Sequence, residues 1–391
     1  MKKSRNFLNK DIIAISTFFT LLFVALCVFM VVFLANDAST VINNPYNRRS
    51  ENLKKKVLRG IIYSEDDDIL AFSENGEDGS EIRDYPYGRE FAHVVGFDVN
   101  GALGLESSYN YNLLSPGVGF FKNISNEING VKSPGKNIRT TLDVPLQEAC
   151  YKALNNISGG VIVMDPSTGS VKALVSAPDF DPASVAENWE SIISDDNKGV
   201  LFNRVTQGAI LPAEIQAGDI TMDFEIFTDE KAFSVQDETD GDGLSTLYQM
   251  AQYVCAAANG GKLMKTILVS EILDADNNVL SKTKYSEAET LLTADECAQL
   301  LEFMQNNVTS GNCGMVKSDS YDVFAIKGEC VADDPEADYE YEHSYFMCIA
   351  QKDDEKIVVC VMIENKQESN TEAIEAAKEI LDYYFRQGIY D

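Results

Sequence analysis

A stretch of 24 residues without a charged side chain, at positions 12–35, is the feature that most constrains the fold of this chain. A helix needs about 20 predominantly apolar residues to cross a bilayer, whereas the apolar region of a cleaved signal peptide is about 7–15 residues long. The residues after it, Ala35-Asn36-Asp37-Ala38, do not form a small-x-small cleavage site. We therefore predict that residues 12–35 form a transmembrane anchor rather than a signal peptide.

Basic residues are concentrated on the N-terminal side of this stretch. Lys2, Lys3, Arg5 and Lys10 precede it. Basic flanking segments stay on the cytoplasmic side of a membrane. We expect residues 1–11 to form a cytoplasmic tail and the bulk of the chain, from residue 36 onward, to lie outside the cell membrane.

The composition excludes several classes of function. Asp and Glu outnumber Lys and Arg by 62 to 32, so the net charge is -30. Nucleic-acid binding needs a basic surface, so no nucleic-acid partner is expected. Two histidines, His93 and His343, are too few for a multi-histidine metal site, and we expect no metal and no cofactor. Cys27 lies in the predicted anchor, which leaves seven cysteines that cannot all pair, so we predict buried free thiols.

Turn signals and the spacing of apolar residues divide the outer part into two regions. Residues 36–136 are interpreted as a polar stalk and a β-rich pedestal domain, and residues 137–391 as a larger domain. The strands predicted in the larger domain are 140–144, 160–164, 171–175, 346–349 and 357–363, and the helices are 146–154, 246–258, 294–306 and 371–386. Strands grouped near both ends with helices between them are typical of an α+β domain, in which helices pack on an antiparallel sheet.

Short sequence blocks along the outer part resemble a known family. The blocks of the larger domain are 137–147, 160–169, 176–182, 202–208, 241–261, 343–346 and 359–364, and those of the pedestal are 59–62, 85–88 and 104–106. In this order they are similar to the transpeptidase domain and the pedestal of class B penicillin-binding proteins. The resemblance covers about residues 43–385 and implies a β-rich pedestal followed by a transpeptidase-like domain.

The resemblance also implies a serine acyl-transfer site, and this sequence departs from it. The family pairs a serine with a lysine one helical turn later (S-x-x-K) and adds an S-x-N motif and a K-T-G strand edge. Here Glu214 falls on the serine position and Ala217 on the lysine position. The third motif is reduced to Lys327, Gly328 and Glu329, and Glu329 adds negative charge where the family binds a carboxylate.

The segment that carries S-x-N in the family is also shortened. Only 26 residues separate Glu214 from Gly241, so we expect an active-site cleft that is either open or filled. Pattern matches elsewhere, S-x-x-K at 133–136 and 281–284 and S-x-N at 310–312, lie in linkers or turns. Since no helix aligns Ser with Lys in the two S-x-x-K matches, we interpret these as chance matches. We interpret the S-x-N match, which follows a predicted helix, as a structural turn.

We therefore predict a membrane-anchored penicillin-binding-protein homologue that has no catalytic residues. Its expected role is that of a scaffold or regulator in peptidoglycan synthesis or cell division, with cell-wall synthesis or division proteins as partners. One alternative is an active D,D-transpeptidase or carboxypeptidase with an unrecognised nucleophile, such as Cys330 or Ser245 beside Lys327. The other alternative is a peptidoglycan-binding module without catalysis.

Overall fold

The structure is a computed structural model. It describes residues 2–36, 52–76, 81–194, 199–208, 211–212, 214–224, 244–333, 340–364 and 371–387. Most of the predicted stalk, residues 37–51, lies outside these ranges.

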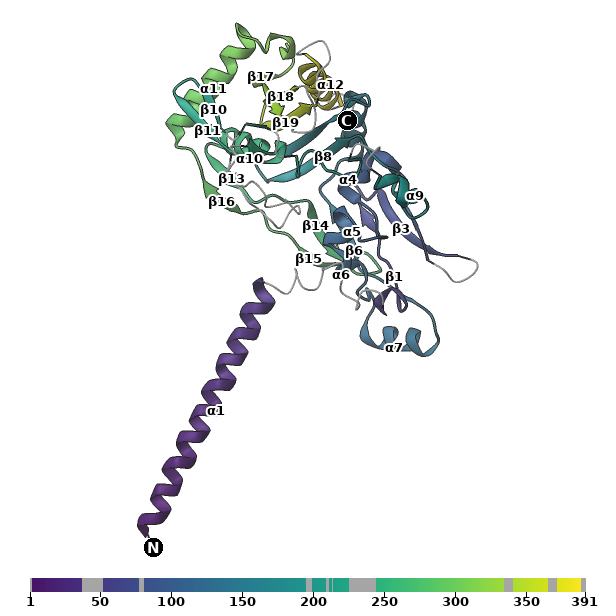
Figure 1. Cartoon of the computed structure of the whole chain (residues 1–391), viewed down its shortest axis with the longest axis vertical. Helices are drawn as coiled ribbons and strands as arrows, with labels where there is room; N and C mark the ends of the chain where they lie inside the picture. Colours follow the sequence, from purple (N-terminus) through teal and green to yellow (C-terminus); the bar gives the residue numbers. More distant parts are fainter. Residues whose placement is uncertain are drawn as a thin grey trace.

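The N-terminal residues form one helix, α1 (Lys2–Asn36), which extends away from the folded outer part (Figure 1). Its segment Ile12–Val32 has a mean hydropathy of 2.7 and is not buried inside the protein. A segment of 21 apolar residues is long enough to cross a bilayer. Within the described residues it is the single helix that meets this criterion, and it fits the predicted single-pass anchor.

A five-stranded antiparallel sheet forms the centre of the larger domain, in the order β17-β18-β19-β7-β8. Its strands are β7 (Gly159–Asp165), β8 (Ser170–Ala177), β17 (Asp322–Asp333), β18 (Glu340–Lys352) and β19 (Glu355–Ile363). The β7–β8 and β18–β19 pairs confirm the two predicted hairpins. The first hairpin turns tightly because the Asp165 carboxylate accepts the Ser167 N–H at 2.8 Å and the Thr168 hydroxyl at 2.7 Å.

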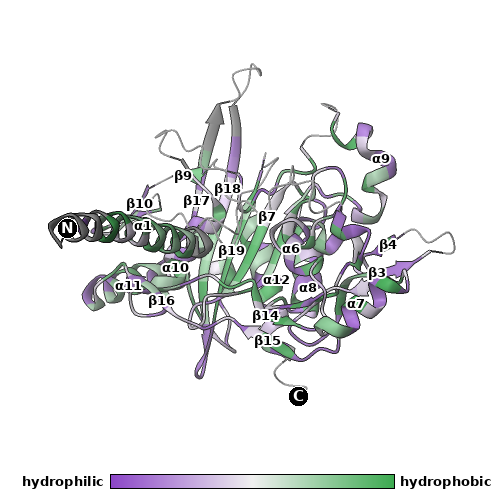
Figure 2. Ribbon diagram, turned by 90° about the horizontal axis from the view of Figure 1, so that it is seen from below, coloured by the Kyte–Doolittle hydropathy of each residue, from purple (hydrophilic) through white to green (hydrophobic). Residues whose placement is uncertain are grey.

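Helices cover both faces of this sheet, and Figure 2 shows the apolar strands between them. On one face lie α8 (Val144–Leu154) and α12 (Glu372–Gln387), and on the other lies α10 (Leu247–Ala258). Side chains alternate between the faces along a strand, so Val161 and Val163 pack with α8 and α12 while Ile162 packs with α10. All twelve residues of α10 are buried, as expected for a helix inside a domain.

Local capping sets the helix boundaries. The Thr246 hydroxyl accepts the Gln249 N–H at 3.2 Å and the Gln249 side chain accepts the Thr246 N–H at 2.8 Å, which starts α10 with a capping box. The strand predicted at 140–144 is wrong beyond Thr140, because β6 (Asn137–Thr140) lies three to four residues earlier and ends before Asp143. The Asp143 carboxylate accepts the Leu146 N–H at 2.8 Å and begins α8 instead.

The pedestal is built around a six-stranded sheet in the order β15-β14-β6-β2-β3-β4. The pedestal region supplies β2 (Ile62–Tyr63), β3 (Ile69–Asn75) and β4 (Glu81–Asp84), and the later chain supplies β6, β14 (Val269–Leu273) and β15 (Val279–Lys282). Residue Ile138 of β6 pairs in parallel with Ile62 and in antiparallel with Ile272 of β14. One sheet therefore contains strands from both sides of the boundary that the sequence predicts at residue 136, and that boundary stays a prediction.

The pedestal also contains short helices besides its strands. These are η1 (Gly88–Phe91), α4 (Ala92–Val95), α5 (Gly104–Ser108), α6 (Asn110–Leu113) and α7 (Phe120–Ile128), with the short strands β1 (Val57–Leu58) and β5 (Ser133–Pro134) paired in parallel. The remaining elements are η2 (Pro182–Ser184), α9 (Val185–Ile192), β9 (Leu211–Pro212), β10 (Glu214–Ala217), β11 (Ile220–Asp223), β12 (Leu244–Ser245), β13 (Lys262–Met264), β16 (Glu287–Thr290), α11 (Ala294–Thr309) and η4 (Gly314–Val316).

A buried ion network joins two of the pedestal blocks. The Glu106 carboxylate, which is fully buried, accepts hydrogen bonds from Arg59 Nε and, at 2.7 Å, from Arg83 Nε. Arg59 and Glu106 are 47 residues apart in the sequence. Because removing one partner of a buried ion pair leaves an uncompensated charge, this network fixes the first strand of the pedestal against α5.

Candidate functional site

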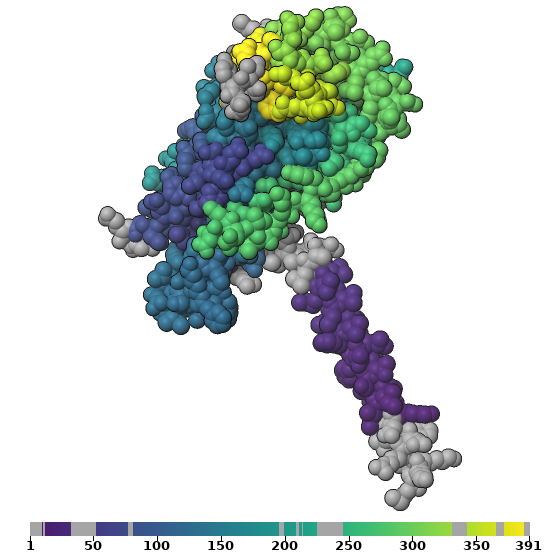
Figure 3. Space-filling view, turned by 180° about the vertical axis from the view of Figure 1, so that it is seen from behind, coloured from purple at the N-terminus to yellow at the C-terminus, as the bar shows by residue number. Residues whose placement is uncertain are grey.

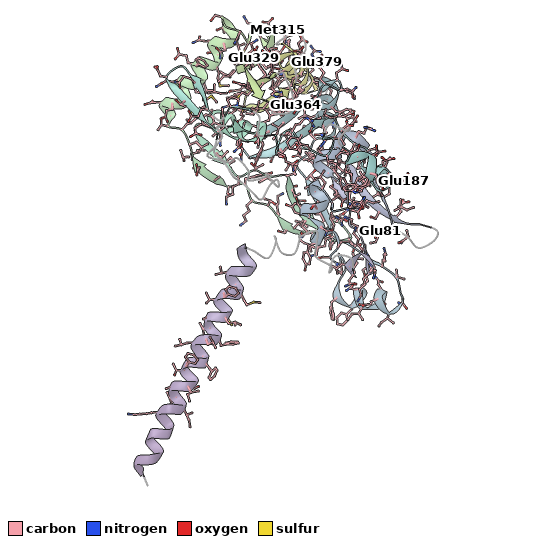
Figure 4. All side chains as sticks on the ribbon, in the orientation of Figure 1. Glu81, Glu187, Met315, Glu329, Glu364 and Glu379 are labelled. Carbon is pink, nitrogen blue, oxygen red and sulfur yellow. The ribbon has the colours of Figure 1, made fainter. Side chains whose placement is uncertain are left out.

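The degenerate third motif lies on β17, at an edge of the five-stranded sheet. Lys327 pairs with Phe346, and Gly328 pairs with Tyr345, across the β17–β18 ladder. Directly paired residues point to the same face, so Lys327 lies on the α12 face with Phe346 and Gly328 lies on the α10 face with Tyr345. Glu329 is exposed and lies at the upper end of the view in Figure 4.

The Tyr345 side chain covers the backbone of Gly328. A Cβ atom placed on Gly328 would lie 2.1 Å from Tyr345 Oη and 2.3 Å from Tyr345 Cζ. Tyr345 is itself buried. The space over β17 on the α10 face is therefore filled at Gly328 by the Tyr345 side chain.

Glu214 and Ala217 lie on a strand rather than on a helix. They are the first and last residues of β10, which pairs with β11 in a hairpin that places Glu214 opposite Asp223 and Ala217 opposite Ile220. Glu214 is exposed, whereas Ala217 is 2% exposed. Strand residues three apart point to opposite faces, so the hairpin separates the two positions that the family brings together.

The β10–β11 hairpin is packed into the hydrophobic core. Ala217, Ile220, Met222 and Phe224 all belong to the cluster that surrounds α10. The Phe224 ring meets the Tyr253 ring of α10 edge-on, with centroids 5.4 Å apart. Ala217, which we predict to stand at the position of the family's lysine, is therefore a small apolar residue of the core.

The two alternative nucleophiles lie on different strands, Cys330 on β17 and Ser245 on β12. Cys330 is half-buried on the α10 face of β17, and burial raises the pKa of its thiol to about 11. The buried Ser245 hydroxyl donates to the Pro212 carbonyl at 2.8 Å. A reactive nucleophile needs a nearby base or a lowered pKa. Ser245 donates to a carbonyl rather than to a base, and the candidate base beside Cys330 is His343, which pairs with it across the β17–β18 ladder.

The cysteine whose thiol is influenced by Lys327 is Cys313, which the sequence analysis did not single out. Burial raises the pKa of the Cys313 thiol to about 11, although the Lys327 charge and a backbone hydrogen bond partly oppose this. The thiol donates to Asn312 Oδ1 at 3.3 Å. No motif spacing relates residues 313 and 327, so only the fold could identify this neighbour.

A cavity of about 400 Å³ lies between the β10–β11 hairpin and the helices α10 and α11. Asp219, Asp223 and Glu296 line it together with Tyr253 and Leu292. Burial, followed by the charge of Glu296, raises the pKa of the Tyr253 hydroxyl to about 12. The three carboxyl groups make this cavity unsuited to an anionic ligand.

One of the two histidines lies beside the third-motif edge and the other does not. His93 is buried beside Phe180, and its Nε2 lies 2.9 Å from the Val200 carbonyl oxygen, to which it donates. Burial lowers the pKa of His93 to about 4. His343 lies on β18 opposite Cys330. Among the described residues, no group of three or more His, Cys, Asp or Glu side chains is arranged to hold a metal ion.

The pattern matches elsewhere in the chain also lie outside helices. Ser133 begins the two-residue strand β5, and Ser281 lies near the end of β15. The segment 310–312 directly follows α11. The extended backbone at the first two positions does not align a serine with a lysine three residues later.

An ion pair joins two of the sequence blocks, 202–208 and 359–364. Arg204 Nε donates to Glu364 Oε2 at 2.7 Å, and the Ser158 hydroxyl donates to the same oxygen at 2.6 Å. This pair joins the segment 199–208 to the end of β19 (Glu364 is labelled in Figure 4). The blocks at 202–208 and 359–364 therefore have a structural role in this chain.

Comparison with protein families supports the interpretation of these blocks. A family model described as the penicillin binding protein transpeptidase domain matches residues 231–382, and one described as the penicillin binding protein A dimerisation domain matches residues 59–138. The chain belongs to the penicillin-binding protein family. This confirms the resemblance found in the sequence. Neither of the two matched ranges of this penicillin-binding protein contains Glu214 or Ala217.

Curated relatives are similar over part of their length. The peptidoglycan D,D-transpeptidase MrdA of Haemophilus influenzae is 28% identical over 215 residues, which are 42% of this chain and 33% of MrdA. The peptidoglycan D,D-transpeptidase PbpA of Mycolicibacterium smegmatis is 30% identical over 205 residues, 46% of this chain and 41% of PbpA. The matches thus span between a third and two fifths of these relatives.

Solved structures confirm the fold. The D,D-transpeptidase domain of a peptidoglycan glycosyltransferase from Eggerthella lenta superposes with a TM-score of 0.66 at 20% identity, over 85% of this chain and 100% of that one. The predicted combination of a pedestal and a transpeptidase-like α+β domain is therefore confirmed as the fold. The assignment of Glu214, Ala217 and the 327–329 edge as degenerate motifs stays a prediction.

Proposed function

We propose that this penicillin-binding protein does not catalyse acyl transfer and acts as a scaffold or regulator in peptidoglycan synthesis or cell division. MrdA and PbpA, to which it is similar, are peptidoglycan D,D-transpeptidases. The proposal therefore concerns a member of an enzymatic family in which the predicted motif positions contribute to packing instead of catalysis.

The observation that carries the proposal is the position of Glu214 and Ala217 on opposite faces of β10. Serine acyl transfer of the S-x-x-K type needs nucleophile and base within hydrogen-bond reach, about 2.6–3.2 Å. A strand separates residues three apart by about 10 Å along its axis. Neither residue type nor backbone conformation at this position supports a nucleophile and its base.

Charge and thiol chemistry agree with this proposal. The exposed Glu329 follows Gly328 on β17, where the family binds a substrate carboxylate. The thiols of Cys313 and Cys330 have a pKa of about 11, so both are protonated at neutral pH and are poor nucleophiles.

The scaffold role follows from what remains of the family architecture. The anchor, the pedestal sheet and the transpeptidase-like sheet are all retained. We propose that α1 crosses the cell membrane with residues 1–11 in the cytoplasm, since Lys2, Lys3, Arg5 and Lys10 lie on that side. The outer part would then face cell-wall synthesis or division proteins, with a negative charge that disfavours anionic wall polymers.

The test is acylation of the full-length protein in detergent by a fluorescent penicillin, followed by intact-mass measurement. We expect no covalent adduct while circular dichroism shows a folded protein. PbpA of Mycolicibacterium smegmatis, labelled in parallel, controls for the reagent. A stoichiometric adduct would overturn the proposal in favour of an active transpeptidase, and the labelled peptide would identify the nucleophile.

A separate measurement addresses the wall itself. Co-sedimentation of the same protein with purified peptidoglycan should leave it in the supernatant. If it pellets without forming an adduct, the peptidoglycan-binding alternative is correct and the scaffold role is wrong.

A further inference from the structure

Helix α7 presents its apolar side to solvent. Phe121 is 85% exposed and Ile128 is 79% exposed, and Phe120 and Ile124 are exposed as well. Their spacing of three and four residues places them on one face of the helix, and Val131, just after the helix, is also exposed. No residue of α7 is buried. We call these five side chains the α7 apolar patch.

The polar side of α7 faces the protein instead. The Ser133 hydroxyl, which is 1% exposed, donates to Asn123 Oδ1 at 2.9 Å and accepts a hydrogen bond from Asn126 Nδ2 at 3.0 Å. Glu127 forms an ion pair with Lys56. An amphipathic helix on a water-soluble surface turns its apolar face inward, so the reversed orientation of α7 indicates that something apolar covers the patch.

Lysines surround the patch in a chain that is otherwise strongly acidic. Lys122 is exposed on α7 itself, and the exposed Lys55 and Lys56 line the same groove as Val131, with Lys56 paired to Glu127. The whole chain has a net charge of -30. Apolar side chains flanked by lysines are typical of a helix that lies in the headgroup region of an anionic membrane.

The groove beside the patch includes residues that lie close to the membrane anchor along the chain. Leu53 and Lys56 line the same groove, of about 300 Å³, as Asn123 and Val131. The 16 residues from 37 to 52 separate α1 from Leu53 of this groove, and 16 residues can span at most about 53–58 Å when fully extended. Figures 1 and 3 show α7 projecting from the end of the outer part nearest to α1.

A second copy of the chain fits the patch less well. Helix α7 lies within the range 59–138 that matches the dimerisation-domain model, so a second copy is the main rival occupant. A symmetric dimer through α7 would bring the same lysine-bearing surface of both copies together. The lysines instead complement an anionic lipid surface.

We propose that the α7 apolar patch docks onto the outer leaflet of the membrane that α1 crosses. Phe120, Phe121 and Ile128 enter the headgroup region, and Lys55 and Lys122 contact anionic headgroups. The docked helix holds the pedestal at a fixed height and orientation above the bilayer. This inference does not depend on whether the chain is catalytic.

The test uses the full-length chain in nanodiscs that each hold one copy. The lipids are brominated phosphatidylcholine with phosphatidylglycerol, and Phe121→Trp supplies the reporter. The native Trp189 packs against Phe97 at a ring-centroid distance of 6.3 Å, and its signal is measured in the parent protein and subtracted. We expect bromine quenching and a blue shift of the reporter at position 121.

Met315→Trp is the matched control, since Met315 is also an exposed apolar residue and lies at the far end of the outer part (Figure 4). Its fluorescence should not be quenched. Lys122→Glu in the Phe121→Trp background should reduce the quenching, and Lys284→Glu, an exposed lysine elsewhere, should not.

Three outcomes would overturn the proposal. An unquenched, unshifted reporter at position 121 means that the patch stays in water. A blue shift without quenching, which grows with protein concentration in detergent, means that a second copy covers the patch. Equal quenching at positions 121 and 315 means that the outer part has no fixed orientation on the membrane. Circular dichroism of each variant excludes misfolding, and Val131→Trp provides an independent reporter on the same patch.

Discussion

Replacing Glu214 with Ser and Ala217 with Lys restores the residue types of the family's first motif, and we expect the double variant to remain unacylated. On a helix, residues three apart lie about 5–6 Å apart on one face. On β10 they lie about 10 Å apart on opposite faces, whereas proton transfer needs about 2.6–3.2 Å between heavy atoms. The new serine would therefore point into solvent without a base.

The two substitutions should also differ in their effect on stability. Glu214 is exposed, so Glu214→Ser alone should change the free energy of unfolding by less than about 0.5 kcal/mol. Ala217 is 2% exposed among Ile220, Met222 and Phe224. Ala217→Lys buries an unpaired ammonium group there, which we expect to cost about 3–5 kcal/mol, a large part of a typical stability of about 5–15 kcal/mol.

The assays are fluorescent-penicillin labelling with intact mass, and urea denaturation of the parent, both single variants and the double variant. Glu214→Ser is the folded control for the labelling. A covalent adduct on the double variant would refute the strand geometry as the reason for inactivity. An Ala217→Lys variant as stable as the parent would show that β10 does not pack into the core.

Three further substitutions test the packing that supports this fold. Glu106→Gln leaves two arginines in the pedestal network without their carboxylate, and urea denaturation should show that the free energy of unfolding falls by about 3–5 kcal/mol. The control is Glu148→Gln, which breaks an exposed pair with Lys152 and should lower the free energy of unfolding by less than about 1 kcal/mol. Thr246→Ala removes the capping box of α10 and should lower the free energy of unfolding by about 1 kcal/mol in the same assay. Burial lowers the pKa of His93 from 6.5 to about 4, so the unfolded state binds its proton first and stability falls as the pH drops through this range, by about 3 kcal/mol in total. His93→Gln keeps a donor for the Val200 carbonyl and should remove this part of the pH dependence, and an unchanged pH profile would contradict the assignment.

The sequence predicted well those elements whose signals are local. The turn at 165–169 contains Asp, Pro and Gly at the positions that a tight turn favours, and the structure has the hairpin there. The helix predicted at 294–306 begins at Ala294 as expected and continues to Thr309. The family assignment rests on blocks that are spread along the chain, and the family models match both of its regions.

The sequence was less informative where packing or distant pairing decides the structure. Residues 214–217 were aligned with a helical motif, but their alternation of polar and apolar side chains, together with Ile220 and Met222, suits a strand packed on one side. Strand β6 ends at Thr140 because the capping role of Asp143 outweighs the continued alternation of apolar residues. The proximity of Cys313 and Lys327 depends on how α11 packs beside β17, which no local pattern specifies.

The shared pedestal sheet has a consequence for how the protein is made. Strand β6 emerges from the ribosome with β2 already available as its partner, but β14 follows roughly 130 residues after Thr140. Protein synthesis adds about 5–20 residues per second. The edge of β6 that pairs with β14 therefore stays without its partner strand for on the order of 10 seconds. An open strand edge is a site of unwanted pairing. The nascent pedestal therefore keeps one unpaired strand edge until the transpeptidase-like region has been synthesised as far as Leu273.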